Sequence, residues 1–227
     1  MIITIDGPTA SGKSTVAAAI AKKLGFYHLN TGLLYRSLSY LLVTKRGYSS
    51  NDLEHVRQED ITECVRPDLF SYEYNEGRDV TVLYEGTDIT QFLKDSSVDQ
   101  YVAIISPQKI VREAMVEQQR ALAKKYNLVI DGRDVGSHVF PHAEHKFYLT
   151  ASLPVRAVRW QKDQRARGHD YTLEEAEAMI SDRDLKDMRR HISPLVVPEG
   201  ATTIDNSEMT FDETVDLLLS RIMKPCH

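Results

Sequence analysis

The feature that most constrains this chain is the segment GPTASGKS at residues 7–14. It matches the pattern G-x-x-x-x-G-K-[ST], directly after a β-branched run (2–6) and directly before a helical pattern (14–24). In such a loop, backbone N–H groups and a helix N-terminus point at a phosphate. The sequence therefore predicts a loop that binds the phosphates of ATP. The residues expected to line it are Gly7, Pro8, Thr9, Ala10, Ser11, Gly12, Lys13, Ser14 and Thr15.

Two side chains of this loop have expected roles in phosphate chemistry. Lys13 can reach the β- and γ-phosphates, and the hydroxyl of Ser14 can ligate Mg²⁺. Asp131 ends the apolar run 128–130 and is the candidate second holder of the metal shell. An equally weighted alternative is that Asp131 only caps a turn at Gly132. A GTPase would need an [NT]-K-x-D guanine reader and a D-x-x-G switch, and the chain contains neither pattern.

The order of apolar patterns predicts an α/β fold with a parallel sheet and helices on both faces. Residues 1–227 form one P-loop domain in this prediction, with a β-rich insertion at 63–95, a lid segment at 154–168 and a turn at 75–77. Strands are expected at 2–6, 27–29, 70–74, 80–84, 128–130, 146–149 and 202–204. Helices are expected at 14–24, from a cap at 30–31 onward, and at 107–125, 154–167, 172–191 and 210–223.

Charge and composition limit the possible partners. The formal net charge is −5, so an anion must be held by a local cluster of positive groups rather than by the whole surface. No apolar run is long enough for a membrane span, and no aromatic–basic face suggests nucleic-acid binding. Cys64 and Cys226 lack metal-ligand spacing and are expected to be unpaired thiols in a reducing cytoplasm. We expect a cytoplasmic monomer.

If the bound triphosphate donates a phosphoryl group, the molecule that accepts it must also be bound as an anion. Three arginine-bearing clusters are candidates for that acceptor site. The first runs from Thr31 to Arg36, and the second contains Arg133 and Asp134. The third consists of Arg183, Asp187 and Arg190, which are three or four residues apart. On a helix the third set falls within about 60° and forms one polar stripe. An alternative of equal weight is a solvated ion-pair ladder.

Further arginines would, taken singly, be surface residues. They are Arg112, Arg156, Arg159, Arg165 and Arg167. However, phosphoryl transfer needs positive groups around the transferred oxygens, and arginine suits phosphate geometry. A run of arginines that ends at Gly168 is typical of a closing lid.

These motifs together resemble a known family. They are IDGPTASGKST (5–15), TGLLYR (31–36), EGTDI (85–89), VRE (111–113), DGRDVGSHVFP (131–141) and RDLKDMRRHISPL (183–195). Across nearly the whole chain they are similar to the bacterial cytidylate kinases. The resemblance implies a P-loop NTPase fold of the adenylate-kinase type, with a β-sheet insertion in the monophosphate-binding region and a helical lid.

The resemblance also implies roles for individual residues. Tyr35 would pack near the pyrimidine, with Thr31 beside it and Arg112 at the cytosine side. The acceptor phosphate would lie among Arg36, Arg133 and Arg190. Residues around the sugar would be Asp134, Arg183 and Asp187.

The chain departs from the family pattern in three places. The serine that reads cytosine is replaced by Gln100 or Asp99, and the chain is longer between Val98 and Arg112. The paired lid arginines become Arg159 and Trp160, and Thr31 replaces a serine.

The expected reaction is in-line transfer of phosphoryl from ATP·Mg²⁺ to CMP or dCMP. The catalytic residues would be Lys13, Arg133, Arg156, Arg159 and Arg190, and the metal residues Ser14 and Asp131. Two alternatives stay open: a kinase with another base preference, such as UMP, and a non-catalytic nucleotide-binding module.

Overall fold

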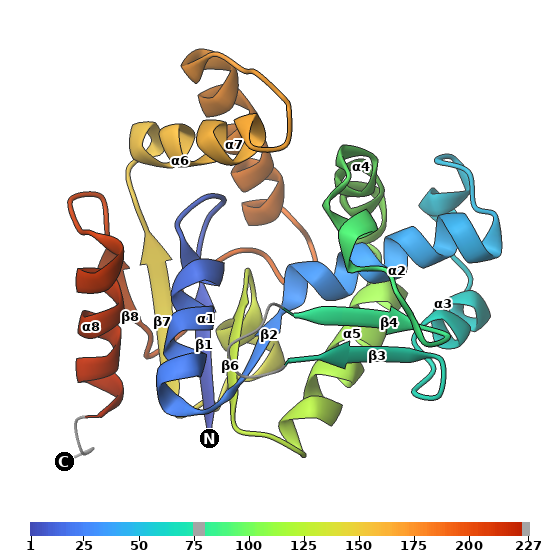
Figure 1. The fold of residues 1–227 in the computed structure, drawn as a ribbon, viewed down its shortest axis with the longest axis horizontal. Helices are drawn as coiled ribbons and strands as arrows, with labels where there is room; N and C mark the ends of the chain where they lie inside the picture. Colours follow the sequence, from blue (N-terminus) through green and yellow to red (C-terminus); the bar gives the residue numbers. More distant parts are fainter. Residues whose placement is uncertain (75–79, 224–227) are drawn as a thin grey trace. The chain divides into compact units, whose positions relative to one another are not determined.

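The computed structural model describes residues 1–74 and 80–223, and the chain divides into two compact units. The first unit comprises Met1–Phe26 and Asn127–His227, and the second comprises Tyr27–Tyr126. Figure 1 labels most of the helices and strands of each unit. The expected turn at 75–77 and Cys226 lie outside the described residues.

The first unit is built on parallel strands. Its strands run in the order β6-β1-β7-β8. Their bounds are β1 (Ile2–Asp6), β6 (Leu128–Gly132), β7 (His145–Thr150) and β8 (Thr202–Asp205). Strands β1 and β6 are buried along almost their whole length, because their sequences are nearly continuous apolar runs. The predicted parallel sheet is confirmed.

Helices accompany these strands as the sequence pattern predicted. They are α1 (Lys13–Leu24), α6 (Leu153–Arg165), α7 (Leu173–Met188) and α8 (Phe211–Ile222). Helix α1 buries Val16 and Ile20, and it packs against β6 and α8 (Figure 1). The chain leaves α1 at Gly25, whose φ of 64° is the left-handed conformation that glycine adopts most easily.

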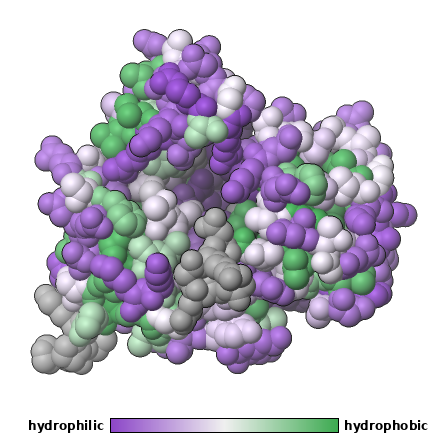
Figure 2. Space-filling model, viewed as in Figure 1, coloured by the Kyte–Doolittle hydropathy of each residue, from purple (hydrophilic) through white to green (hydrophobic). Residues whose placement is uncertain are grey.

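Helices α6 and α7 form a small packed pair beyond the end of β7 (Figure 1). Its core contains Ala157, Ala176 and Ile180, and Trp160 packs against them. The ring of Trp160 also lies 5.1 Å from that of Tyr171. The tryptophan at this position therefore holds α6 and α7 together. Figure 2 shows that the outer surface of this pair mixes hydrophilic residues with hydrophobic ones.

One predicted helix end is wrong. The pattern predicts a helix through residue 191, but α7 ends at Met188, and Arg189 has the non-helical angles φ −92° and ψ 0°. The backbone N–H of Leu195 instead donates to the carbonyl of Asp187. Arg190 therefore lies beyond the helix, and the expected stripe of 183, 187 and 190 on one helix does not form.

The second unit combines helices with a small antiparallel sheet in the order β3-β4-β5. The strands of this small sheet are β3 (Phe70–Glu73), β4 (Thr81–Tyr84) and β5 (Thr87–Asp88). The unit also contains the strand β2 (Tyr27–Asn30), which is not part of the small sheet. The antiparallel strands fall inside the expected β-rich segment 63–95. The α-helices of this unit are α2 (Thr31–Arg46), α3 (Gln58–Cys64), α4 (Ser96–Ile105) and α5 (Lys109–Ala123).

Helix α2 begins where the sequence placed its cap. The side chain of Asn30 accepts from the backbone N–H of Leu33, which satisfies one of the free donors at the helix start.

Among the described residues, no helix is both long and apolar enough to cross a bilayer.

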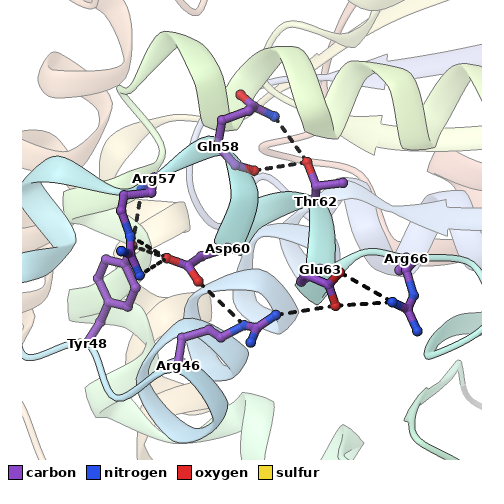
Figure 3. Close-up of polar contacts among 8 residues, drawn as sticks. All are labelled: Arg46, Tyr48, Arg57, Gln58, Asp60, Thr62, Glu63 and Arg66. Atoms are coloured by element: carbon purple, nitrogen blue, oxygen red, sulfur yellow. Dashed lines mark hydrogen bonds and ion pairs between the residues drawn. The ribbon is translucent and has the colours of Figure 1, made fainter.

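A buried carboxylate connects the end of α2 to α3 (Figure 3). Asp60 accepts hydrogen bonds of 2.8 Å from the Tyr48 hydroxyl and from Nε of Arg57. Nε of Arg46 lies 3.7 Å from its other oxygen, and Nη2 of Arg46 lies 3.4 Å from Glu63. These contacts fix the polar connection 47–57 against both helices.

Candidate active site

The loop at residues 7–14 leaves the end of β1 and leads into α1 of the first unit. A side chain at Gly7 would place its Cβ 2.0 Å from the carbonyl oxygen of Leu149, so only glycine fits. Gly12 precedes α1 with φ 86°, again a left-handed conformation. These two glycines let the backbone form a close cradle at the start of a helix.

Lys13 lies buried inside this cradle. Its Nζ donates to the carbonyl of Pro8 at 2.8 Å. Burial and the positive charge of Arg133 hold the pKa of Lys13 well below its usual value, and Arg183 acts in the same direction. A bound polyphosphate would supply the negative charge that this cluster lacks.

The loop also contains an unused polar atom. The Ser11 side chain is fully buried, and its Oγ has no hydrogen-bond partner within the described residues. A buried hydroxyl without a partner is costly, so a ligand oxygen at this point would satisfy it.

Ser14 and Asp131 come together as candidate metal ligands. The Ser14 hydroxyl donates to the Asp131 carboxylate at 2.5 Å. A hydroxyl and a carboxylate are hard oxygen donors of the kind that Mg²⁺ takes beside phosphate oxygens. The pair therefore fits the metal, and the role of Asp131 as a metal holder stays a prediction.

Arg133 follows β6 and contacts both the loop and the end of α7. It donates to the carbonyl of Gly7 at 2.9 Å and to Oγ1 of Thr9 at 3.1 Å, and its Nε donates to Asp187 at 2.8 Å. Nη1 of Arg190 lies 3.6 Å from the other Asp187 oxygen. One carboxylate thus brings two predicted phosphate-binding arginines together, although Arg190 is not helical.

The two expected lid arginines also lie against the loop. Arg156 donates to the carbonyl of Thr9 at 3.0 Å and to Asp184 at 2.5 Å. Arg159 donates to the side chain of Asn206 at 3.0 Å and to its backbone carbonyl at 3.1 Å. Helix α6 therefore places both guanidinium groups beside the phosphate cradle. Arg165 and Arg167, by contrast, are exposed near the end of α6.

The remaining predicted residues of this unit are Asp134 and Arg183. Asp134 is buried directly after Arg133, and Arg183 is exposed on α7. The charge of Asp134 acts on Asp6, and that of Arg183 acts on Lys13. Both residues are thus close enough to influence groups at the phosphate loop.

In the second unit, Tyr35 and Arg112 form one pair. The Arg112 guanidinium lies 5.8 Å from the centre of the Tyr35 ring, which is a cation–π distance. Arg112 is only 3% exposed and donates to the carbonyl of Ser106. The view of Arg112 as an isolated surface arginine is therefore wrong.

Arg36 and Asp99 form the other pair of the second unit. Arg36 donates to the Asp99 carboxylate, and its Nη1 donates to the carbonyl of Leu93 at 3.0 Å. Thr31, the first residue of α2, is buried. Gln100 is exposed, so of the two residues that replace the expected serine, Asp99 is the one that contacts Arg36.

Sequence reasoning assigned no site role to three buried polar residues of the first unit. Asp6 accepts the backbone N–H groups of Val135 and Gly136, at 2.9 and 2.7 Å. Asp184 and Asn206 both contact the phosphate loop. Two signals were available in the sequence. Asp6 stands at the end of a buried strand, and Asp184 follows Ala176 and Ile180 at four-residue intervals on α7.

A parallel sheet with a glycine cradle, a buried lysine and a serine–carboxylate pair defines a P-loop nucleotide-binding protein, and the converging arginines define a phosphotransferase. The comparisons with known proteins identify the family. A family model described as cytidylate kinase matches residues 3–224. The chain belongs to the cytidylate kinase family.

Individual relatives agree with this assignment. The chain is 36% identical over 219 residues to a cytidylate kinase of Bacillus cereus (strain G9842), covering 96% of this chain and 94% of that relative. It is 34% identical over 221 residues to one of Bacillus anthracis, covering 97% and 95%.

Solved structures share the fold at low sequence identity. An uncharacterized protein from Eubacterium ventriosum has a TM-score of 0.54 at 12% identity, covering 99% of both chains. A shikimate kinase from Bacteroides thetaiotaomicron has a TM-score of 0.50 at 13% identity, again covering 99% of both. These likenesses show the fold alone.

Proposed function

We propose that this protein transfers the γ-phosphoryl group of ATP to CMP or dCMP, giving ADP and CDP or dCDP. The observation that carries the proposal is the set of buried and half-buried positive groups around one glycine cradle in a chain with net charge −5. Lys13, Arg133 and Arg156 make up this set. Membership of the cytidylate kinase family supports the choice of acceptor.

The donor site of the proposal is residues 7–15. Lys13 would neutralise the β- and γ-phosphates, and the Ser11 hydroxyl would donate to a phosphate oxygen. Mg²⁺, held by Ser14 and Asp131, would supply further neutralisation of phosphate charge.

The acceptor site follows from the family motifs. The acceptor phosphate would be held by Arg36, Arg133 and Arg190, and the base by Thr31, Tyr35 and Arg112. The sugar would be bound by Asp134, Arg183 and Asp187. The contacts of Arg112 with Tyr35, and of Asp187 with both Arg133 and Arg190, support these groupings.

The proposed reaction is a direct in-line displacement. A monophosphate oxygen forms the new bond to the γ-phosphorus while the bond to the β,γ-bridging oxygen breaks, and ADP leaves. No general base is needed because the attacking oxygen is already anionic. Arg156 and Arg159 would stabilise the charge on the transferred group, so catalysis consists of positioning and charge stabilisation. We further propose that the protein is a cytoplasmic monomer.

The test is a coupled assay of ADP release with CMP, dCMP, UMP, AMP and GMP as acceptors. We expect CMP and dCMP to stimulate release most. Equal or greater stimulation by UMP would replace the proposed acceptor with another base, and no stimulation by any acceptor would indicate a non-catalytic nucleotide-binding protein.

The same assay tests the role of Lys13. Lys13→Ala should cost roughly 3–4 kcal/mol of transition-state stabilisation, by analogy with loss of an oxyanion donor. The matched control is Lys22→Ala, since Lys22 is an exposed lysine on the same helix. This variant should keep normal activity. Near-normal turnover of Lys13→Ala would show that the proposed mechanism is wrong.

A further inference from the structure

Asp184 is a carboxylate on the buried side of α7. It follows Ile180 by four residues and Ala176 by eight, so all three lie along one side of the helix. Both apolar residues are buried, and Asp184 is only 4% exposed. Burial of a charged carboxylate costs free energy unless strong partners compensate for it. The partners of Asp184 therefore indicate its purpose.

Those partners are the phosphate loop and a predicted catalytic arginine. Oδ1 of Asp184 accepts from the backbone N–H of Thr9 at 2.8 Å. Oδ2 accepts from Nη1 of Arg156 at 2.5 Å. The same Nη1 donates to the carbonyl of Thr9 at 3.0 Å. The three residues thus form a closed ring of hydrogen bonds in which both polar backbone groups of Thr9 are held.

The ring joins three segments that are far apart in the sequence. Thr9 belongs to the phosphate loop, Arg156 to α6 and Asp184 to α7. Nε of Arg156 also donates to the carbonyl of Ala151, so its guanidinium is held from two sides. Charge-assisted bonds of this kind are shorter and stronger than neutral ones, and they fix orientation.

We propose that Asp184 is a positioning residue for phosphoryl transfer, which orients the Arg156 guanidinium and sets the conformation of the phosphate loop at Thr9. This inference rests on the proposed function. Asp184 acts through its two neighbours, because its carboxylate oxygens are directed at Thr9 and Arg156 rather than at a phosphate, which it would repel.

A merely structural ion pair makes a different prediction. Its loss would lower thermal stability and leave the kinetic constants of the folded enzyme unchanged. Loss of a positioning residue lowers kcat, because Arg156 then no longer meets the transferred group in the correct geometry. The Michaelis constant for CMP should stay nearly constant, since the residues proposed to bind CMP are others.

The test variant is Asp184→Asn, which keeps the shape of the side chain. The amide oxygen can still accept from Thr9, but the amide N–H₂ now faces Nη1 of Arg156, so that bond is lost. We expect kcat to fall by about 10²-fold, the scale of a small misplacement of a reacting group, with the KM for CMP changed by less than about threefold.

Asp182→Asn is the matched control. Asp182 lies two residues earlier on α7, is exposed and pairs with Lys186 at 2.6 Å. The variant Asp182→Asn should leave kcat and the Michaelis constants for CMP and for ATP unchanged. Asp184→Glu is measured alongside; it keeps the charge but displaces it by one methylene, and we expect it to fold and also to lose turnover.

A double-mutant cycle with Arg156→Lys completes the experiment. If both residues act as one unit, the double variant should be no slower than the slower single variant. A folded Asp184→Asn with kcat within about twofold of wild type, or effects that simply multiply, would overturn the inference. Failure of the wild-type protein to phosphorylate CMP would instead overturn the proposed function.

Discussion

The residues around the phosphate loop show how buried charge is balanced in this protein. Lys13 is buried near Arg133, and Asp131 and Asp184 lie near enough to favour its charged form. Asp6 is also fully buried at the end of β1, but its carboxylate accepts from backbone N–H groups of the segment that follows Arg133. Asp6 thereby ties β1 to the turn that carries Arg133 and Asp134.

The burial of Asp6 leads to a pH-dependence prediction. Burial raises the pKa of Asp6 to about 7, although its two backbone hydrogen bonds lower it. An unfolded aspartate ionises near pH 3.9. Between about pH 4 and pH 7, the folded protein holds a proton that the unfolded chain has released, so the free energy of unfolding falls as pH rises through this range. Urea unfolding at a series of pH values measures this decline.

The variant Asp6→Asn removes the titrating group and should flatten this part of the pH profile. Asp163→Asn, at an exposed position on α6, should leave the profile as it is in the wild type. An unchanged slope in Asp6→Asn would show that other groups cause the decline.

At the scale of elements, the periodicity of the sequence predicted the long strands and helices. It did not predict the elements or helix ends that depend on tertiary contacts. Strands β1, β6, β7 and β8 and helices α1 and α8 agree with the predicted ranges within a residue or two. Helices α3 and α4 were not predicted. α3 is short and lies partly in a polar segment, and Asp60 in its first turn contacts Tyr48 and Arg46, which no local pattern reveals.

The end of α7 shows the same limit. Its apolar and polar positions continue past Met188, but a backbone hydrogen bond from Leu195 to Asp187 turns the chain back. The pairing of Arg190 with Asp187 survives this error, because the two residues are adjacent through the turn rather than along a helix.

The Asp60 network predicts a stability effect at the connection between α2 and α3. In Asp60→Ala the Tyr48 hydroxyl loses its acceptor and Arg57 and Arg46 lose a carboxylate. Leaving a buried polar group unsatisfied should lower the free energy of unfolding by about 1–3 kcal/mol. Denaturant unfolding measures this loss, and Glu59→Ala on the exposed side of α3 is the control. Equal stability of the two variants would contradict a structural role for Asp60.

This network also has a defined pH dependence. The hydroxyl of Tyr48, and then the guanidinium of Arg57, lower the pKa of Asp60. The stabilisation is therefore complete above the unfolded value near pH 3.9 and is lost as pH falls further. Asp60→Ala should not show this acid-side loss.

At the scale of the whole molecule, the alternation of strands and helices and the phosphate loop were enough to predict the fold class. The site was predicted less completely. The motifs predicted roles for the arginines, but Asp6, Asp184 and Asn206 received none, because the role of each depends on contacts with a distant segment. The residues proposed for the acceptor come from both units. Contacts within each unit support part of the grouping, and the family motifs supply the rest.

The most direct test of the central claim follows the phosphoryl group itself. The protein is incubated with CMP and with ATP radiolabelled in the γ-phosphate, and the products are separated. We expect the label in the terminal phosphate of CDP, one ADP for each CDP, and no labelled protein at any time. Label that accumulates as inorganic phosphate, or on the protein before CDP forms, would contradict direct transfer between the two nucleotides.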